Sequence, residues 1–162
     1  GEEVSFLEEN GISVEIVPGI TSGIAASSYV GIPLTHRHGA SSVTFVTGHE
    51  TSEKQEKSVN WRQLALSSNS LVIYMGIRNI EYIVEELIIG GMKRDTKCAA
   101  IQEATLKNQK SLMTELSKLP EAIKENNIKP PAIVIIGRIV DFQVKNTITK
   151  LSAVNLPKIK KI

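Results

Sequence analysis

The chain has 162 residues, of which 41% are hydrophobic and 22% charged, and this length and apolar content exclude an intrinsically disordered protein. Its 19 basic and 17 acidic residues leave a net charge of +2 and only 4% of its residues are aromatic, so a nucleic-acid-binding surface is not indicated. A single cysteine excludes an intramolecular disulfide and favours a reducing, cytoplasmic location.

The first forty residues predict a helix, a strand and a second helix. Residues 4–10 read as the end of a helix that stops at an Asn-Gly pair, and residues 13–17 read as a short strand. After a Pro-Gly turn, Thr21 or Ser22 caps a helix of small residues. Residues 16–35 carry no charge, but about half of them are Gly, Pro, Ser or Thr, so we expect no membrane span; the opening residues also lack the features of a signal peptide.

The middle of the chain alternates strands and helices. We expect a strand over residues 42–47, an exposed loop over 49–59, a helix over 61–66 capped by Asn60, and an apolar strand over 71–75. Apolar residues recur at helical spacing over residues 79–89, with glutamates on the opposite side, which predicts an amphipathic helix that two glycines terminate.

The last part predicts a hairpin, a helix and a buried strand. Strands over 98–101 and 111–116 are joined by a turn at residues 107–108, and Pro120 suits the first turn of a helix that ends near Asn127. Residues 132–136 are apolar at every position, as in sheets that helices cover on both faces. The Lys-rich residues 146–162 show no pattern. The fold class is therefore α/β, with the main domain over residues 41–145.

Common catalytic patterns are missing from the sequence. A His-Glu pair at residues 49–50 lacks the second histidine of a zinc-protease helix. His36 and His38 stand two apart without nearby cysteines or a carboxylate cluster, so we predict no metal site. Cys98 begins an apolar strand and is interpreted as a core residue rather than a nucleophile.

Residues 17–22, Val-Pro-Gly-Ile-Thr-Ser, run from a predicted strand through a tight turn into a helix N-terminus. This arrangement offers free N–H groups and a hydroxyl to a polar or anionic ligand. An ordinary capped helix explains the same residues, and the pattern alone does not decide between the two.

Eight short sequence blocks stand out along the chain. They are Val-Pro-Gly-Ile-Thr-Ser-Gly-Ile-Ala-Ala at 17–26, Gly-Ile-Pro-Leu-Thr-His-Arg at 31–37, Ser-Ser-Val at 41–43, Thr-Gly-His at 47–49, Asn-Trp at 60–61, Leu-Ala at 64–65, Tyr-Met-Gly at 74–76 and Lys-Pro-Pro-Ala-Ile-Val-Ile-Ile-Gly at 129–137. In these blocks the chain resembles the tetrapyrrole (corrin/porphyrin) methylases, and among them the branch that methylates uroporphyrinogen III. The likeness covers nearly all of residues 1–143 in order and spacing.

The resemblance implies S-adenosylmethionine as the cofactor, S-adenosylhomocysteine as its product, and a cleft between two α/β domains. By similarity Thr21 and Ser22 contact the cofactor from the first domain, Met75 packs near the adenosine, and Ala104 and Ala132 complete the pocket. From their patterns alone, Met75 and Ala132 would be ordinary core residues.

His36 and Arg37 lie at the predicted junction between the two domains. They either meet the acidic side chains of the substrate or merely fix the linker, and the sequence leaves both interpretations open.

The implied reaction transfers methyl groups to C2 and C7 of uroporphyrinogen III and gives precorrin-2, in a homodimer without nucleic-acid or membrane partners. In-line positioning of the methyl group matters more here than a strong base.

The family's Gly-rich G-x-G-x-G-D loop and Gly-Gly-Asp-Pro segment are missing, and with them the acid–base residues, so no catalytic residue is predicted in this chain. We therefore expect residues 1–40 to be the C-terminal remnant of a first domain, residues 41–145 a complete second α/β domain with a mixed sheet, and residues 146–162 a tail. Such a chain is expected to be inactive by itself. One alternative is another tetrapyrrole methylase that acts on a cobalamin precursor. The other is a non-catalytic dimerising module, suggested by the helix over residues 79–89 and by the truncated first domain, since both leave apolar surface to cover.

Overall fold

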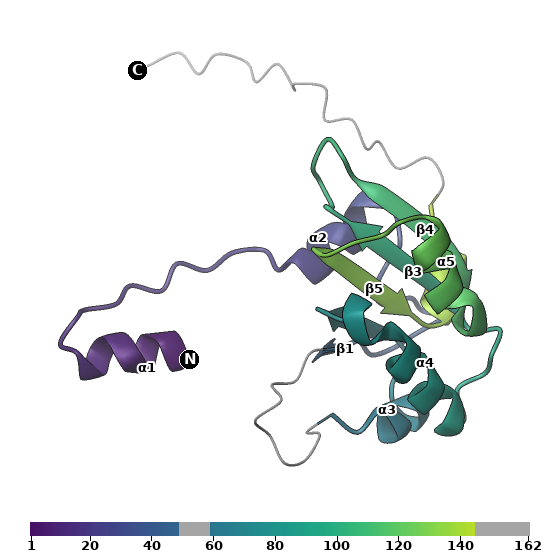
Figure 1. Cartoon of the computed structure of the whole chain (residues 1–162), viewed down its shortest axis with the longest axis horizontal. Helices are drawn as coiled ribbons and strands as arrows, with labels where there is room; N and C mark the ends of the chain where they lie inside the picture. Colours follow the sequence, from purple (N-terminus) through teal and green to yellow (C-terminus); the bar gives the residue numbers. More distant parts are fainter. Residues whose placement is uncertain (49–58, 145–162) are drawn as a thin grey trace.

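The computed structural model describes residues 1–48 and 59–144. A five-stranded mixed sheet lies at its centre (Figure 1). The strand order is β1-β2-β5-β3-β4. β1 runs parallel to β2, and the other neighbouring pairs are antiparallel, which confirms the predicted mixed α/β sheet. The strands are β1 (Thr44–Thr47), β2 (Leu71–Tyr74), β3 (Lys97–Gln102), β4 (Lys110–Glu115) and β5 (Ala132–Ile136).

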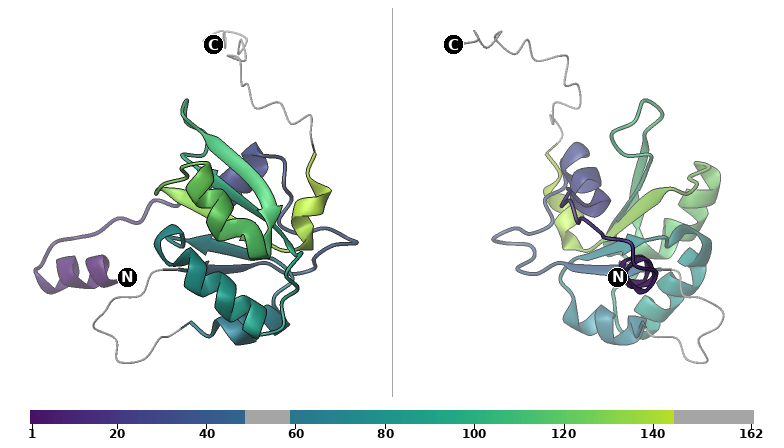
Figure 2. Two further views of the ribbon diagram at one scale, coloured as in Figure 1. Left: turned by 45° about the vertical axis from the view of Figure 1, so that its right-hand side comes forward. Right: turned by 90° about the vertical axis from the view of Figure 1, so that its left-hand side faces the viewer.

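Helices cover the two faces of this sheet, as Figure 2 shows. One face carries α3, α4 and α5, and the opposite face carries α2 and η3. The helices are α1 (Glu2–Glu9), α2 (Ser22–Tyr29), α3 (Trp61–Ser67), α4 (Ile80–Ile89) and α5 (Leu119–Glu125), with short 3₁₀ turns η1 (Ile77–Asn79), η2 (Leu116–Lys118) and η3 (Arg138–Phe142).

The side chains of the central strand β5 explain why helices cover both faces of the sheet. Successive side chains of a strand point to opposite faces, and here both sets are apolar. Ile133 and Ile135 pack with Ala26 of α2, whereas Val134 and Ile136 pack with the residues of α3, α4 and α5. The prediction of a strand buried on both faces is therefore confirmed.

The amphipathic helix α4 is part of this core. Ile80, Ile83, Val84 and Leu87 are all buried, and Asn60 caps the neighbouring α3 by accepting a hydrogen bond from the Gln63 N–H at 3.0 Å. The apolar stripe of α4 is therefore used inside the fold. This removes one of the two reasons for considering a dimerising module; the other, the truncated first domain, is not affected by it.

The first twenty residues extend away from the sheet, and α1 has no buried residue (Figure 1). The predicted strand over residues 13–17 is wrong for this structure, because those residues pair with no other strand in the described part of the chain. Alternation of apolar residues shows that a segment can form a strand, but a neighbouring backbone must supply the hydrogen bonds. Ile16 and Val17 are consequently more than three-quarters exposed.

Two of the predictions fall on residues whose structure is not described. These are nearly all of the loop over 49–59 and the tail over 146–162. Among the described helices, none has both the length and the apolarity needed to cross a bilayer. The predicted domain boundary after residue 40 stays a prediction, although α2 packs directly on the sheet.

Candidate functional site

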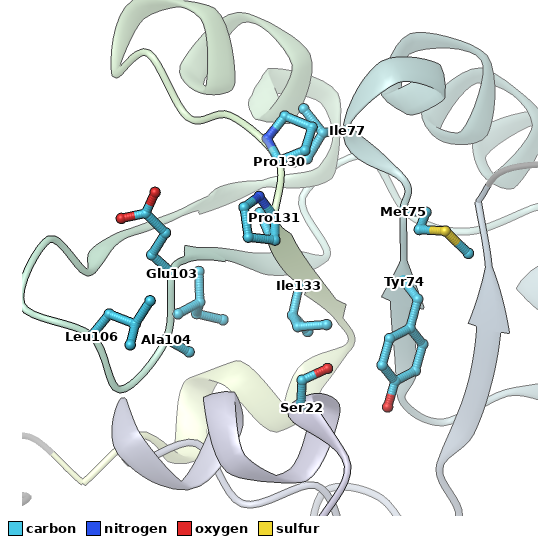
Figure 3. Close-up of a pocket in the computed structure, with 12 residues that line it drawn as sticks. Ser22, Tyr74, Met75, Ile77, Glu103, Ala104, Leu106, Pro130, Pro131 and Ile133 are labelled. Carbon is cyan, nitrogen blue, oxygen red and sulfur yellow. The ribbon is translucent and has the colours of Figure 1, made fainter.

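A pocket of about 620 Å³ opens at the edge of the sheet where β2 and β3 end and β5 begins. Its volume lies within the usual range for small-molecule sites, about 300–1,000 Å³. Figure 3 shows Ser22 and Tyr74 on one side, Ala104 and Leu106 on another, and the two prolines between them. The lining residues are Ser22, Tyr74, Met75, Ile77, Ile101, Glu103, Ala104, Leu106, Pro130, Pro131, Ala132 and Ile133.

The walls of the pocket are mostly apolar. Ile101 and Ile133 are buried in the sheet and form the floor, while Met75 and Leu106 are more than half exposed at the rim. Ala104 and Ala132 carry the smallest side chains of the lining. Small residues at two places let a flat ring come close to the backbone, which a longer side chain would prevent.

The backbone around the pocket adopts conformations that are uncommon for residues with a side chain. Met75, Glu103 and Thr105 have φ angles of 52°, 48° and 74°. Such left-handed residues are energetically unfavourable outside glycine and gather at functional sites. Within residues 1–48 and 59–144, the peptide groups of Met75 and Ala104 make no hydrogen bond, so they are available to a ligand.

Tyr74 links the N-terminus of α2 to the sheet. Its hydroxyl lies 2.5 Å from Thr21 Oγ1 and accepts a hydrogen bond from the Gly23 N–H at 3.2 Å. Thr21 is the N-cap residue of α2 but caps no N–H with its own hydroxyl, so the tyrosine takes over this role. The contact fixes Ser22 at the pocket wall.

The sequence-based list missed Tyr74, the last residue of β2, because its contacts with Thr21 and Gly23 join residues about fifty positions apart. Of the five residues predicted for the cofactor, Ser22, Met75, Ala104 and Ala132 line the pocket together. Thr21 is outside the lining and is held next to it by Tyr74. Their roles in binding a cofactor stay a prediction.

His36 and Arg37 are elsewhere in the fold. Their loop contacts the start of β2, where the Ser70 hydroxyl donates to the Leu34 carbonyl at 3.0 Å. The four residues of β2, about 13 Å at the usual rise per residue, separate this loop from the pocket. The His36 ring stacks on Phe142, with ring centroids 3.9 Å apart. The two residues therefore do not line the pocket, and both interpretations of them, a substrate contact and a linker role, stay predictions.

Cys98 and a second hollow offer little reactive chemistry. Burial raises the pKa of the Cys98 thiol far above its ordinary value, so the thiol stays neutral. The second hollow, of about 350 Å³, lies beside β4, and its carboxylate Glu115 is paired with Lys97 and Lys118. Among the described residues no group of three or more His, Cys, Asp or Glu side chains could hold a metal ion.

The geometry defines an α/β protein with a ligand-sized pocket, whose walls are mostly apolar and whose edge includes residues in left-handed backbone conformations. The sequence model of the tetrapyrrole (corrin/porphyrin) methylases matches residues 1–120, and the chain belongs to this family.

Curated relatives agree with this assignment. The chain is 45% identical over 142 residues to a uroporphyrinogen-III C-methyltransferase of Synechocystis, covering 88% of this chain and 54% of the relative. It is 44% identical over 145 residues to a Bacillus subtilis protein of the same name, covering 90% and 56%. The chain thus spans about half the length of the curated relatives it matches.

A solved structure is similar as well. Uroporphyrin-III C-methyl transferase from Thermus thermophilus, complexed with S-adenyl homocysteine, superposes with a TM-score of 0.72 at 30% identity. The match covers 86% of this chain and 59% of that one.

Proposed function

We propose that the pocket binds S-adenosylmethionine and that the chain is the cofactor-binding part of a methyltransferase that acts on uroporphyrinogen III. The observation that carries the proposal is the convergence of Ser22, Met75, Ala104 and Ala132 in one ligand-sized pocket. Two relatives are named uroporphyrinogen-III C-methyltransferase, and a similar solved structure holds S-adenyl homocysteine; both facts support the proposal. The reaction would be C-methylation at C2 and C7 to give precorrin-2.

The residues present fit this cofactor. The adenine ring needs an apolar slot that admits a flat group, which Ile101, Ile133 and the two alanines supply. Its edge nitrogens and its amino group need hydrogen-bond partners, and the peptide groups of Met75 and Ala104, which have no hydrogen-bond partner among the described residues, would meet this need. When bound, S-adenosylmethionine supplies an electrophilic methyl group.

The contribution of the chain would be positioning. Methyl transfer requires the reacting carbon, the methyl group and the sulfur to lie in line, so a rigid pocket lowers the barrier by holding one reactant in place. Tyr74 fixes one wall of the pocket through its hydrogen bonds to Thr21 and Gly23, and Ile101 and Ile133 form a buried floor. No described residue is assigned as an acid or a base.

The experiment is a calorimetric titration of the chain with S-adenosylhomocysteine. We expect one-to-one binding, and Ala104→Leu should weaken it by about tenfold or more, because loss of about 1.4 kcal/mol of contact changes affinity tenfold. Ala122→Leu, the same substitution on α5 outside the pocket lining, is the matched control and should bind normally. Equal binding by the wild-type chain and Ala104→Leu would rule out this pocket as the site.

The expected homodimer is a separate proposal that the contacts within one chain do not address. Sedimentation equilibrium measures it directly, and a purely monomeric chain at micromolar concentration would contradict it.

A further inference from the structure

The loops that surround the pocket carry an excess of positive charge. Residues 75–79, 103–109 and 126–131 connect the strands and helices at the edge of the sheet that holds the pocket. They contain three basic residues, Arg78, Lys107 and Lys129, and one acidic residue, Glu103. All three basic side chains are exposed.

Each of these cations is the sequence neighbour of a residue that lines the pocket. Arg78 follows Ile77, Lys107 follows Leu106, and Lys129 precedes Pro130. These loops belong to β2, β3 and β5, which lie side by side in the order β2-β5-β3. Two inter-strand spacings place the outer loops about 10 Å apart, and the long basic side chains extend this reach further.

Within the part of the chain that the structure describes, none of the three cations forms an ion pair. The ion pairs formed among the described residues involve Arg62, Lys97, Lys118 and Lys124, and none involves Arg78, Lys107 or Lys129. An exposed cation beside an apolar pocket attracts anions with little loss of hydration, because it stays at the water boundary.

We propose that Arg78, Lys107 and Lys129 form a basic rim that binds the carboxylate side chains of an anionic tetrapyrrole at the mouth of the pocket. This inference rests on the proposed function, because the acetate and propionate arms of uroporphyrinogen are the anions that the rim would recognise. Charge complementarity selects the substrate class: a porphyrin with more carboxylates binds more tightly than a more apolar one with fewer.

The test uses the fluorescence of uroporphyrin, an oxidised and stable form of the ring that keeps the same carboxylate arms. The chain is titrated with uroporphyrin and, separately, with coproporphyrin, which has methyl groups in place of the acetates. The variant R78Q/K107Q/K129Q should bind uroporphyrin roughly tenfold more weakly, since each exposed charge contact is worth about two- to fivefold. Raising the salt from about 0.1 M to about 1 M shortens the Debye length from about 10 Å to about 3 Å. Uroporphyrin binding should therefore weaken more for the wild-type chain than for this variant.

The matched control is K93Q/R94Q/R138Q. It removes the same net charge from exposed residues at the opposite edge of the sheet, before β3 and after β5. It should change uroporphyrin affinity by less than about twofold. Three results would each overturn the proposed rim. Both triple variants could lose uroporphyrin affinity equally, the wild-type chain could bind coproporphyrin more tightly than uroporphyrin, or it could bind no uroporphyrin at all.

S-adenosylhomocysteine titrations of the same samples separate this inference from the proposed function. If the rim fails while S-adenosylhomocysteine still binds, the cofactor pocket stands and only the rim is wrong. If S-adenosylhomocysteine also fails to bind, the proposed function fails with it.

Discussion

Substituting Gly23 by alanine sets two physical effects against each other. Gly23 lies in the first turn of α2, where alanine is favoured over glycine by up to about 1 kcal/mol. An added Cβ, however, would stand 2.4 Å from Tyr74 Oη, 2.9 Å from Val72 Cγ1 and 3.0 Å from Phe45 Cε1.

The steric effect should prevail. Overpacking of this kind costs about 1–3 kcal/mol, and the Tyr74 hydroxyl cannot move away freely because it is bonded to Thr21 and to the Gly23 N–H. Weakening those bonds costs about 1 kcal/mol more. After the helix-propensity gain, the net loss of unfolding free energy is about 1–3 kcal/mol. Displacement of Tyr74 should also weaken S-adenosylhomocysteine binding.

Urea denaturation followed by circular dichroism measures this loss. With a slope of about 1–3 kcal/mol per molar urea, the midpoint should fall by roughly 1 M. Gly19→Ala is the matched control, because its Cβ would meet nothing within 4 Å. In the double variant Gly23→Ala/Tyr74→Phe the closest clash disappears. Its loss of unfolding free energy should therefore be smaller than the sum of the losses in the two single variants. A Gly23→Ala protein as stable as the wild type would refute the reasoning.

Three further predictions concern the core and the surface. Leu87→Ala should lower the unfolding free energy by about 2–5 kcal/mol in denaturation experiments, whereas Ile89→Ala, on the exposed side of the same helix, should cost less than about 1 kcal/mol; similar losses would contradict the assigned core. Cys98 should resist alkylation in the native chain and react only on unfolding, and rapid native labelling would show that it is accessible. The hydrogen bond from Lys118 lowers the pKa of Glu115, so this pair stabilises the fold at neutral pH and is lost as the pH falls through that lowered value. The unfolding free energy of Glu115→Gln should therefore be lower than that of the wild type at pH 7, and the two values should converge in acid. A difference in unfolding free energy that stays constant with pH would argue against the pair.

Most of the helices and strands could be predicted because each has a local signal. The periodic apolar residues of α4, the Asn60 cap and the uniformly apolar β5 are determined by short stretches of sequence. The strand over residues 13–17 could not be decided in this way, since a strand depends on a partner that lies elsewhere in space. Strand order likewise depends on contacts between distant segments.

The candidate site was predictable only in part. Met75, Ala104 and Ala132 were found through the resemblance and not through any chemistry of their side chains, because they contribute shape and backbone groups. The contact of Tyr74 with Thr21 and Gly23 joins residues about fifty positions apart, so no local pattern reveals it. The sequence left the role of His36 open, and the fold stacks its ring on Phe142 outside the pocket lining, a contact that no local pattern predicts.

The most direct test of the proposed cofactor pocket is a methyl NMR spectrum of the chain labelled at its methionines, recorded with increasing S-adenosylhomocysteine. The chain has three methionines in different places: Met75 lines the pocket, Met92 packs against the core beside α4, and Met113 lines the hollow beside β4. A large, saturable shift of the Met75 methyl signal, with those of Met92 and Met113 unchanged, is the predicted result. A shift confined to Met113, or no shift at all at saturating ligand, would contradict the assignment of this pocket.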